Sequence, residues 1–480
     1  MIFNSEEQLF VFDRKNWEKV CSEDYSLPHP GVEIIKDGIV LPLKKRTDVT
    51  FSEGACEGGI CDADGKFVTG NCRHLKNDPF NMSCTRGYKL DKDPGVRGEA
   101  VYWGGVLFWH FGHVIMESLS RLWWFAENPN MPYKIVFLDF PFGGGFTAYS
   151  VLEALGITRD RMEIITEPTR FKEIIVPEES IYMWSGFRAG WETVFNLLQE
   201  RAGKGEYEKV YLSRTRLKKQ DAINEIYFEN FYRNRGYQII YPEQHSFLEQ
   251  VSILYGAKEV VCTNGTLVHM LLFCSPGTKA VVLNRDNDIQ KTMLYSLQVR
   301  KLDYSIIDVN YNFLPVAHSG KNVFFYGPTI YWKQYLQKKR IPYSEDEISF
   351  DIHVKPLIYD YLLKWAGNYK DIVGYKRIYN CTMADVIKCI YRAFGGEQIN
   401  LKGFPEADKI VKLRKENAVL QKEISNVNEA KANTKSLNDN YEILIGDLKR
   451  HIKYLEGSVS WRITRPLRKV RALQKRIMEK

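Results

Sequence analysis

Four ionisable side chains near position 115 have the types and the spacing needed for acid–base chemistry. They recur three and four residues apart, so on a helix they would share one face. They are His110, His113, Glu117 and Arg121. The other faces of this segment are apolar, and ionisable groups beside such flanks are costly unless they face a cleft or pair internally. We expect Glu117 or His113 to accept a proton in catalysis; the alternative is that Glu117 only pairs with Arg121.

A second group of polar residues lies in residues 209–285, where short apolar runs alternate with helical patterns. The runs predict strands at 210–212, 237–241, 260–261 and 280–283. Strands that alternate with helices at this spacing indicate a parallel sheet with helical crossovers. Ligands bind such sheets outside the carboxyl ends of the strands, so the residues that follow each strand are candidates for binding.

Several of those residues suit a phosphate group. Arg214 and Arg216 carry planar, permanently charged guanidinium groups that match phosphate oxygens. Gly265 lets the backbone approach a ligand closely, and the helix expected after it would point free N–H groups outward. The predicted nucleotide-binding residues are Arg214, Arg216, Glu243, Asn264, Gly265, Thr266 and His269. Each also has an ordinary explanation, since strand-end arginines are often only solvated and Asn-Gly is a common turn.

Both groups lie in stretches that resemble glycosyltransferase family 61. The resemblance is carried by Tyr211-Leu212-Ser213-Arg214, Asn224-Glu225, Gly236-Tyr237, Pro242-Glu243, Glu249-Gln250, Ala257 and Asn264-Gly265-Thr266, and by the block from His110 to Leu122. It spans roughly residues 100–285 in the order of the family, although the family usually has His-Gly-Ala at 264–266. The resemblance implies the GT-B architecture, two Rossmann-like domains facing a cleft. It also implies inverting transfer from a nucleotide sugar, with no essential metal and no cofactor.

Length and composition predict an α/β protein with extensions, because 480 residues exceed one ordinary core. We expect an acceptor-side α/β domain at residues 1–205 and a nucleotide-sugar-binding Rossmann-like domain at 206–315. A helical cap that returns to the first domain is expected at 316–404, a coiled coil at 405–456 and a basic tail at 457–480.

The last two regions predict association with other molecules. Apolar residues in 405–456 recur every three or four positions, which favours a coiled-coil homo-oligomer over a single helix folded back on the body. The tail carries +7 of the net charge of +8, so the body is nearly neutral, which argues against nucleic-acid binding. Trp461 among these cations suits an anionic inner membrane surface, and a disordered solubilising tail is the alternative. The tail also resembles the ends of bacterial polysaccharide glycosyltransferases.

Other signals concern location and metals. The N-terminus is acidic, and no apolar run reaches the roughly 18 residues that span a bilayer, so we expect a cytoplasmic protein peripherally bound to the membrane. Four cysteines cluster without the paired spacing of a zinc site, which leaves metal binding by them open. They are Cys56, Cys61, Cys72 and Cys84. Asp62/Asp64 and Asp286/Asp288 match the Asp-x-Asp signature of metal-dependent glycosyltransferases only superficially.

The sequence thus predicts a hexosyl- or pentosyltransferase that builds a surface polysaccharide such as a capsule. Its partners would be a nucleotide-sugar donor and a saccharide or lipid-linked saccharide acceptor. The alternative is a non-catalytic scaffold that organises a polysaccharide-assembly complex through the coiled coil and the tail. The sequence names neither the sugar, the nucleotide base, the acceptor nor the linkage.

Overall fold

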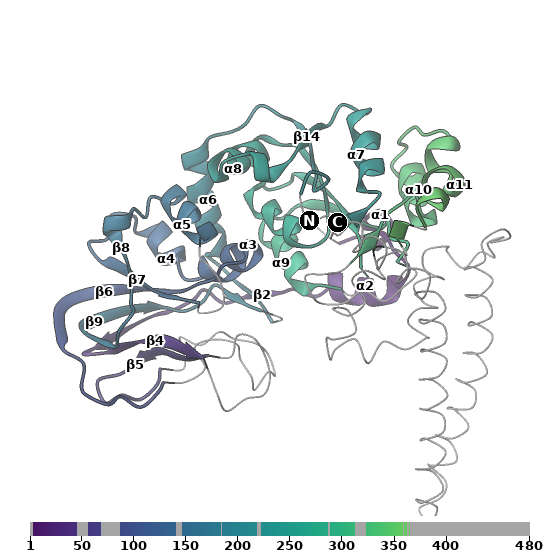
Figure 1. Ribbon diagram of the computed structural model, residues 1–480. Helices are drawn as coiled ribbons and strands as arrows, with labels where there is room; N and C mark the ends of the chain where they lie inside the picture. Colours follow the sequence, from purple (N-terminus) through teal and green to yellow (C-terminus); the bar gives the residue numbers. More distant parts are fainter. Residues whose placement is uncertain are drawn as a thin grey trace, which may run out of the picture. The chain divides into compact units, whose positions relative to one another are not determined.

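The computed structural model, drawn in Figure 1, describes most of the chain up to residue 358. The described residues are 3–45, 56–68, 87–140, 146–183, 185–217, 222–286, 289–312, 323–358, 360–361 and 364. The predicted coiled coil, the basic tail and most of the predicted cap lie outside them, as do Cys72, Cys84 and Asp288.

The described residues fall into two compact units. The first lies within Met1–Lys218, Phe228–Asn284 and Asp288–Asp308, and the second within Lys219–Tyr227, Arg285–Asn287 and Val309–Lys480. In its described residues the first unit contains three β-sheets, of six, seven and three strands.

A six-stranded parallel sheet forms the second half of this unit. Its order is β1-β17-β16-β15-β12-β14, and every pair is parallel, which confirms the sheet predicted for residues 209–285. The strands are β12 (Lys209–Leu212), β14 (Gln238–Ile240), β15 (Glu259–Thr263), β16 (Lys279–Asn284), β17 (Asp303–Asp308) and β1 (Leu9–Phe10). Val260 and Val282 are fully buried, as the central strands of a doubly covered sheet require. The pairing of Leu9 with Ile306 was not expected, and it joins the N-terminal segment to this sheet.

Helices connect these strands as the sequence pattern predicts. They are α7 (Glu225–Arg233), η4 (Pro242–Gln244), α8 (Phe247–Gly256), η5 (Thr266–Phe273) and α9 (Lys291–Val299); α1 (Ser5–Gln8) precedes β1, and α2 (Arg14–Cys21) follows it. A capping box fixes the start of α8: Glu249 N–H donates to Ser246 Oγ at 3.4 Å, and Ser246 N–H donates to Glu249 Oε2 at 2.7 Å.

A mixed seven-stranded sheet forms the first half. Its order is β5-β4-β9-β6-β7-β8, with β3 also paired to β9. The strands are β3 (Val32–Lys36), β4 (Ile39–Lys45), β5 (Cys56–Cys61), β6 (Val96–Leu107), β7 (Lys134–Asp139), β8 (Met162–Ile164) and β9 (Thr169–Pro177). The pairs β6–β7, β6–β9 and β7–β8 are parallel, whereas β3, β4 and β5 pair antiparallel.

Helices and a small sheet complete this half. The helices are α4 (Trp123–Glu127), α5 (Phe146–Ala154), η3 (Arg159–Arg161) and α6 (Trp191–Ala202); β2 (Ser26–Leu27), β10 (Ile181–Tyr182) and β11 (Gly186–Arg188) form the small sheet. In Figure 1 the helices α4, α5 and α6 lie along one face of the sheet that contains β6 and β9.

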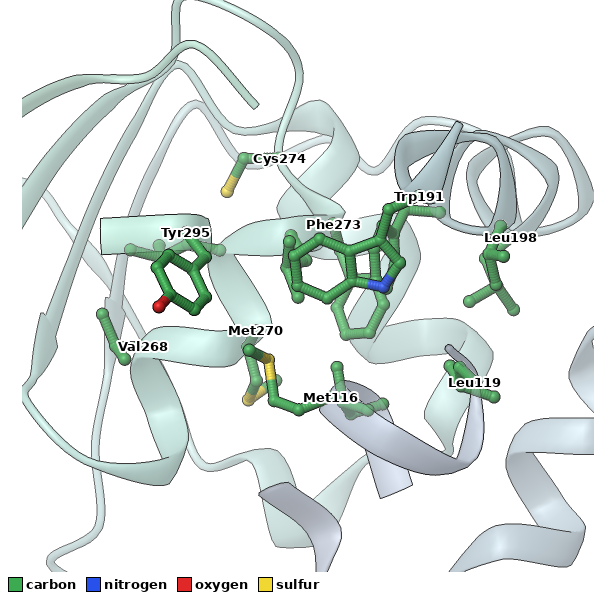
Figure 2. Close-up of a cluster of buried hydrophobic side chains, with 14 of the residues drawn as sticks. Met116, Leu119, Trp191, Leu198, Val268, Met270, Phe273, Cys274 and Tyr295 are labelled. Carbon is green, nitrogen blue, oxygen red and sulfur yellow. The ribbon is translucent and has the colours of Figure 1, made fainter. Parts of the chain in front are cut away.

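One apolar core joins the two halves of the first unit. Figure 2 shows Met116 and Leu119 packed with Trp191 of α6 and Phe273 of η5. Buried Arg300 reinforces this core with polar contacts across the same boundary. Its guanidinium donates to Asn196 Oδ1 at 2.7 Å, Gln199 Oε1 at 2.9 Å and the Cys274 carbonyl oxygen at 3.0 Å. The halves are therefore held in one arrangement, and that arrangement positions the site described below.

The second unit is smaller. Strands β13 (Ala222–Ile223) and β18 (Phe324–Phe325) pair in parallel beside α10 (Ile330–Lys338), η6 (Asp346–Ile348), α11 (Phe350–His353) and η7 (Lys355–Leu357). Asn224 ties them together, because its amide donates to the carbonyl oxygens of Tyr326 at 3.0 Å and His353 at 2.9 Å. In the described residues, none of the helices has the length and apolar character needed to cross a membrane.

Candidate active site

The chain that leaves β6 enters an unusual helical turn. The sequence predicts a helix that starts near His110 and carries residues up to Arg121, but only α3 (Phe111–His113) is α-helical there, and η2 (Val114–Ser118) is a π-helix. The wider turn is visible in the bond from Leu119 N–H to the Val114 carbonyl oxygen, five residues back, at 3.1 Å. Ser118 Oγ also accepts a hydrogen bond from Phe108 N–H at 2.9 Å, which anchors the turn to the end of the strand. Single π turns are rare and occur often at functional sites.

The π-helix holds His113 and Glu117 in contact. Nδ1 of His113 meets Oε2 of Glu117, and the ring of His113 packs against Phe108 with centroids 5.6 Å apart. The carboxylate is nearly buried, with 6% of the side chain exposed, whereas the imidazole is 39% exposed. When Nδ1–H donates to the carboxylate, Nε2 is the basic nitrogen that remains available.

Arg121 does not share the face of His113, which corrects the row of four groups expected from the spacing. It is 2% exposed, donates to the Pro177 carbonyl oxygen and lies 3.3 Å from Glu179 Oε1. The extra residue in the π turn rotates the following residues, so Arg121 fastens the end of η2 to the end of β9.

Groups from the second half lie beside this pair. A Cβ on Gly112 would stand 3.5 Å from Thr266 Cγ2, so the backbone of α3 passes close to the start of η5. Partial desolvation and then the positive charges of His113 and Arg214 lower the pKa of His110. Of the predicted phosphate-binding residues, Thr266 thus lies close to Gly112, and the charge of Arg214 acts on His110.

His269 belongs to the same group but is buried in η5. Burial lowers its pKa to about 4, helped by the charges of His113 and His110. Its Nδ1 lies 3.3 Å from Ser296 Oγ. His269 is therefore a neutral imidazole at physiological pH.

A chain of amides along the sheet edge shapes the turn after β15. Asn264 Nδ2 donates to Asn284 Oδ1 at 3.0 Å, and Asn284 Nδ2 donates to Asp308 Oδ1 at 2.6 Å. Asn264 Oδ1 accepts a hydrogen bond from Gly265 N–H at 2.7 Å. Gly265 has φ 124° and ψ −148°, a conformation open essentially only to glycine. These hydrogen bonds of the Asn264 side chain stabilise the turn itself.

The helix after this turn differs from the expected one. Residues Thr266–Phe273 wind as a 3₁₀ helix, shown by the bond from Val268 N–H to the Gly265 carbonyl oxygen at 3.1 Å. Residues 267–273 are all buried, so packing against α6, α8 and α9 surrounds this segment on every side. Thr266 at its start is half-buried.

The two arginines follow β12 as predicted. Arg214 is half-buried, and Arg216 is exposed, with its guanidinium 4.0 Å above the ring of Tyr241. Arg216 Nη1 also lies 3.5 Å from Gln244 Oε1 in η4. Glu243, the preceding residue in η4, is exposed at the same sheet edge.

Glu229 of α7 also contacts residues at this edge of the sheet. It was not predicted from the sequence. Its buried carboxylate accepts hydrogen bonds from Ser213, Thr215 and Tyr241. The available signal was the recurrence of Glu225, Glu229 and Arg233 every four residues on one helix.

The cysteines and aspartates near β5 serve a different region. Burial raises the pKa of the Cys56 thiol to about 12 and that of Cys61 to about 11. Asp62 Oδ1 accepts the N–H groups of Asp64 at 3.1 Å and Lys66 at 2.8 Å, so it stabilises a turn. Within the described part of the chain, no three His, Cys, Asp or Glu side chains are grouped as metal ligands.

A histidine–carboxylate pair of this geometry can act as a general base. Residues 111–281 match the family described as Glycosyltransferase 61. The matched span runs from α3 into β16, so it contains His113, Glu117, Arg214 and η5. This match supports glycosyl transfer in general. No curated protein matches the chain.

Proposed function

We propose that the protein transfers a hexose or pentose from a nucleotide sugar to a saccharide or lipid-linked saccharide acceptor, building a surface polysaccharide such as a capsule. One observation carries the proposal. The His113–Glu117 pair follows Gly112, which lies close to Thr266 of the second half, and the charges of His113 on His269 and of Arg214 on His110 connect the two groups electrostatically. These relationships support a site that combines a proton acceptor with phosphate-suited cations. The architecture that we propose is GT-B, in which two Rossmann-like domains face a cleft.

The donor diphosphate would be bound by Arg214, Arg216 and the backbone at Gly265. Negative charge grows on the leaving diphosphate as the glycosidic bond breaks, and fixed cations stabilise that charge without reorganising. Guanidinium groups suit this task because they match phosphate oxygens in a bidentate way. This charge stabilisation requires no metal ion.

The acceptor would be activated by His113. Its imidazole is the more exposed member of the pair, and its Nε2 takes the proton from the attacking acceptor hydroxyl. The nearly buried carboxylate of Glu117 fixes the tautomer and stabilises the imidazolium that forms. Attack from the side opposite the diphosphate inverts the anomeric configuration.

The segments beyond the described residues extend the proposal. The +7 charge and Trp461 of the tail 457–480 support peripheral binding to the inner face of the cytoplasmic membrane. The apolar repeat in 405–456 supports a homo-oligomer.

A thermal-shift screen of nucleotide sugars, followed by transfer to a lipid-linked acceptor, tests the proposal. A donor at 100 times its Kd should stabilise the folded protein by roughly 2.7 kcal/mol. Labelled sugar should then appear on the acceptor. A protein that no nucleotide sugar stabilises and that transfers nothing would instead be a scaffold of the assembly complex.

A further inference from the structure

Glu229 is a carboxylate that is hidden from solvent beside the strand-end arginines. Only 2% of its side chain is exposed. Oε2 accepts hydrogen bonds from Ser213 Oγ at 2.7 Å and Thr215 Oγ1 at 2.6 Å. Oε1 accepts a hydrogen bond from the Tyr241 hydroxyl at 2.8 Å and contacts the guanidinium of Arg233.

These donors keep the carboxylate charged. Burial by itself raises the pKa of Glu229, but hydrogen bonds from Thr215, Ser213, Tyr241 and Arg233 bring the pKa below its ordinary value. A buried charge is costly unless it is fully hydrogen-bonded. Its contacts reach the ends of two strands, β12 and β14, so the carboxylate connects those ends to α7.

The first consequence is that the backbone on both sides of Arg214 is fixed. Ser213 and Thr215, its two neighbours, both donate to Oε2 of Glu229. Ser213 Oγ also accepts a hydrogen bond from Thr215 N–H at 3.1 Å. The Arg214 carbonyl oxygen accepts a hydrogen bond from Leu217 N–H at 3.1 Å, which closes a turn. The backbone that carries the Arg214 side chain is therefore held in place. After burial and the charge of His113, the charge of Arg214 also lowers the pKa of His110.

The second consequence concerns Arg216. Its guanidinium lies 4.0 Å from the centroid of the Tyr241 ring, a cation–π contact. The hydroxyl of that same tyrosine is held by Oε1 of Glu229. The guanidinium of Arg216 thus packs on the Tyr241 ring, and the Glu229 carboxylate orients that ring.

We propose that Glu229 is a positioning residue for the donor diphosphate, because its one carboxylate orients both Arg214 and Arg216. This inference rests on the proposed function, in which those arginines bind the donor. Arg233, which is 46% exposed, offsets the negative charge of Glu229, so the carboxylate can support the arginines with less repulsion of the diphosphate.

The test compares the Glu229→Gln variant with the unmodified protein and with the Arg214→Ala variant, all as full-length chains. The probes are UDP and GDP in calorimetry, and the donor found in the thermal-shift screen is used for kinetics. Glutamine keeps the size of the side chain but loses the charge and one acceptor oxygen. We expect the affinity for the diphosphate to fall about 10- to 100-fold and the donor KM to rise, with a smaller change in kcat.

The combination of variants separates positioning from a general loss of stability. If Glu229 acts through the arginines, Glu229→Gln should add little to the loss already caused by Arg214→Ala with Arg216→Ala. Glu259→Gln is the matched control, because Glu259 Oε2 also accepts a hydrogen bond from a tyrosine hydroxyl, that of Tyr237, at 2.7 Å. This pair lies at the opposite edge of the same sheet, where the strands begin. It should leave nucleotide affinity unchanged.

Two milder variants keep the test decisive if Glu229→Gln folds poorly. Thr215→Val and Tyr241→Phe each remove one hydrogen bond to Glu229 and leave its charge in place. Each should weaken diphosphate binding in the same direction. Wild-type affinity in these variants and in Glu229→Gln, together with weakened binding by Arg214→Ala, would overturn the positioning role and leave the proposed function standing. No binding of any nucleoside diphosphate by the unmodified protein would overturn both.

Discussion

Nδ1 of His113 contacts Oε2 of Glu117 across one π-helical turn, and the imidazole is exposed where the carboxylate is nearly buried. This difference in exposure divides the roles within the pair. The buried carboxylate can hold the ring in one tautomer, while Nε2 of the ring can receive a proton from a bound hydroxyl.

Glu117→Gln should lower kcat by about 10²–10⁴-fold and leave nucleotide affinity intact, because glutamine keeps the shape but cannot stabilise the imidazolium. Turnover per folded molecule and thermal stability are measured on the same preparation. Glu163→Gln, at a carboxylate on β8 that pairs with Arg97, is the control for a lost ion pair. Near-normal turnover with reduced stability would assign Glu117 a structural role only.

Arg214→Ala should weaken nucleoside diphosphate binding by about 1.5–3 kcal/mol, the usual contribution of a hydrogen bond to a charged group. Calorimetry measures this directly. Arg159→Ala removes an exposed arginine that pairs with Glu153, so it controls for the change in net charge. Equal affinities in the two variants would remove Arg214 from the donor site.

Acid should destabilise the protein partly through His269. Its folded pKa of about 4 lies below the ordinary value of 6.5, so the unfolded chain binds more protons between those two values. The free energy of unfolding should therefore fall as pH drops through this window, by about 1.5 kcal/mol between pH 6.5 and pH 5. Urea unfolding of the wild-type protein and of His269→Gln at both pH values measures the difference. An equal pH dependence in the two proteins would contradict the assignment to His269.

Transfer should continue in the presence of EDTA. The proposed stabilisation of the leaving diphosphate comes from Arg214 and Arg216, and Asp62 is occupied in a backbone turn. The initial rate is compared before and after chelation. Complete loss of activity that manganese or magnesium restores would instead promote Asp286 and Asp288 as metal ligands.

Removal of residues 457–480 should reduce binding to anionic vesicles while transfer to a soluble acceptor analogue persists. Each cation near such a surface contributes about 1 kcal/mol, and Trp461 adds an interfacial anchor. Co-sedimentation with vesicles that contain phosphatidylglycerol measures the binding. Identical binding by the truncated and full-length chains would leave the tail without this role.

The sequence predicts the parallel sheet well because its strands are short, β-branched and followed by clear turn residues. Val260 and Val261, for example, lie in β15, and Asn264-Gly265 forms the turn directly after it. β1 could not be predicted, since its two residues become a strand only by pairing with β17, almost 300 positions later.

The candidate site is predictable only in part for a similar reason. The spacing of His113 and Glu117 indicates their contact, because it needs only one helical turn. The π turn and the burial of Arg121 depend on Phe108, Pro177 and Glu179, which periodicity does not reveal. Glu229 was missed because its partners lie at the ends of other strands.

The most direct test of the proposed reaction is proton NMR of the protein incubated with the selected nucleotide sugar and a saccharide acceptor. The proposed mechanism predicts that the donor is consumed and that the new linkage has the inverted anomeric configuration. It also predicts that His113→Ala, still folded and still binding nucleotide, forms this product at least about 100-fold more slowly. A product of retained configuration, or a His113→Ala protein that turns over at the wild-type rate, would contradict it.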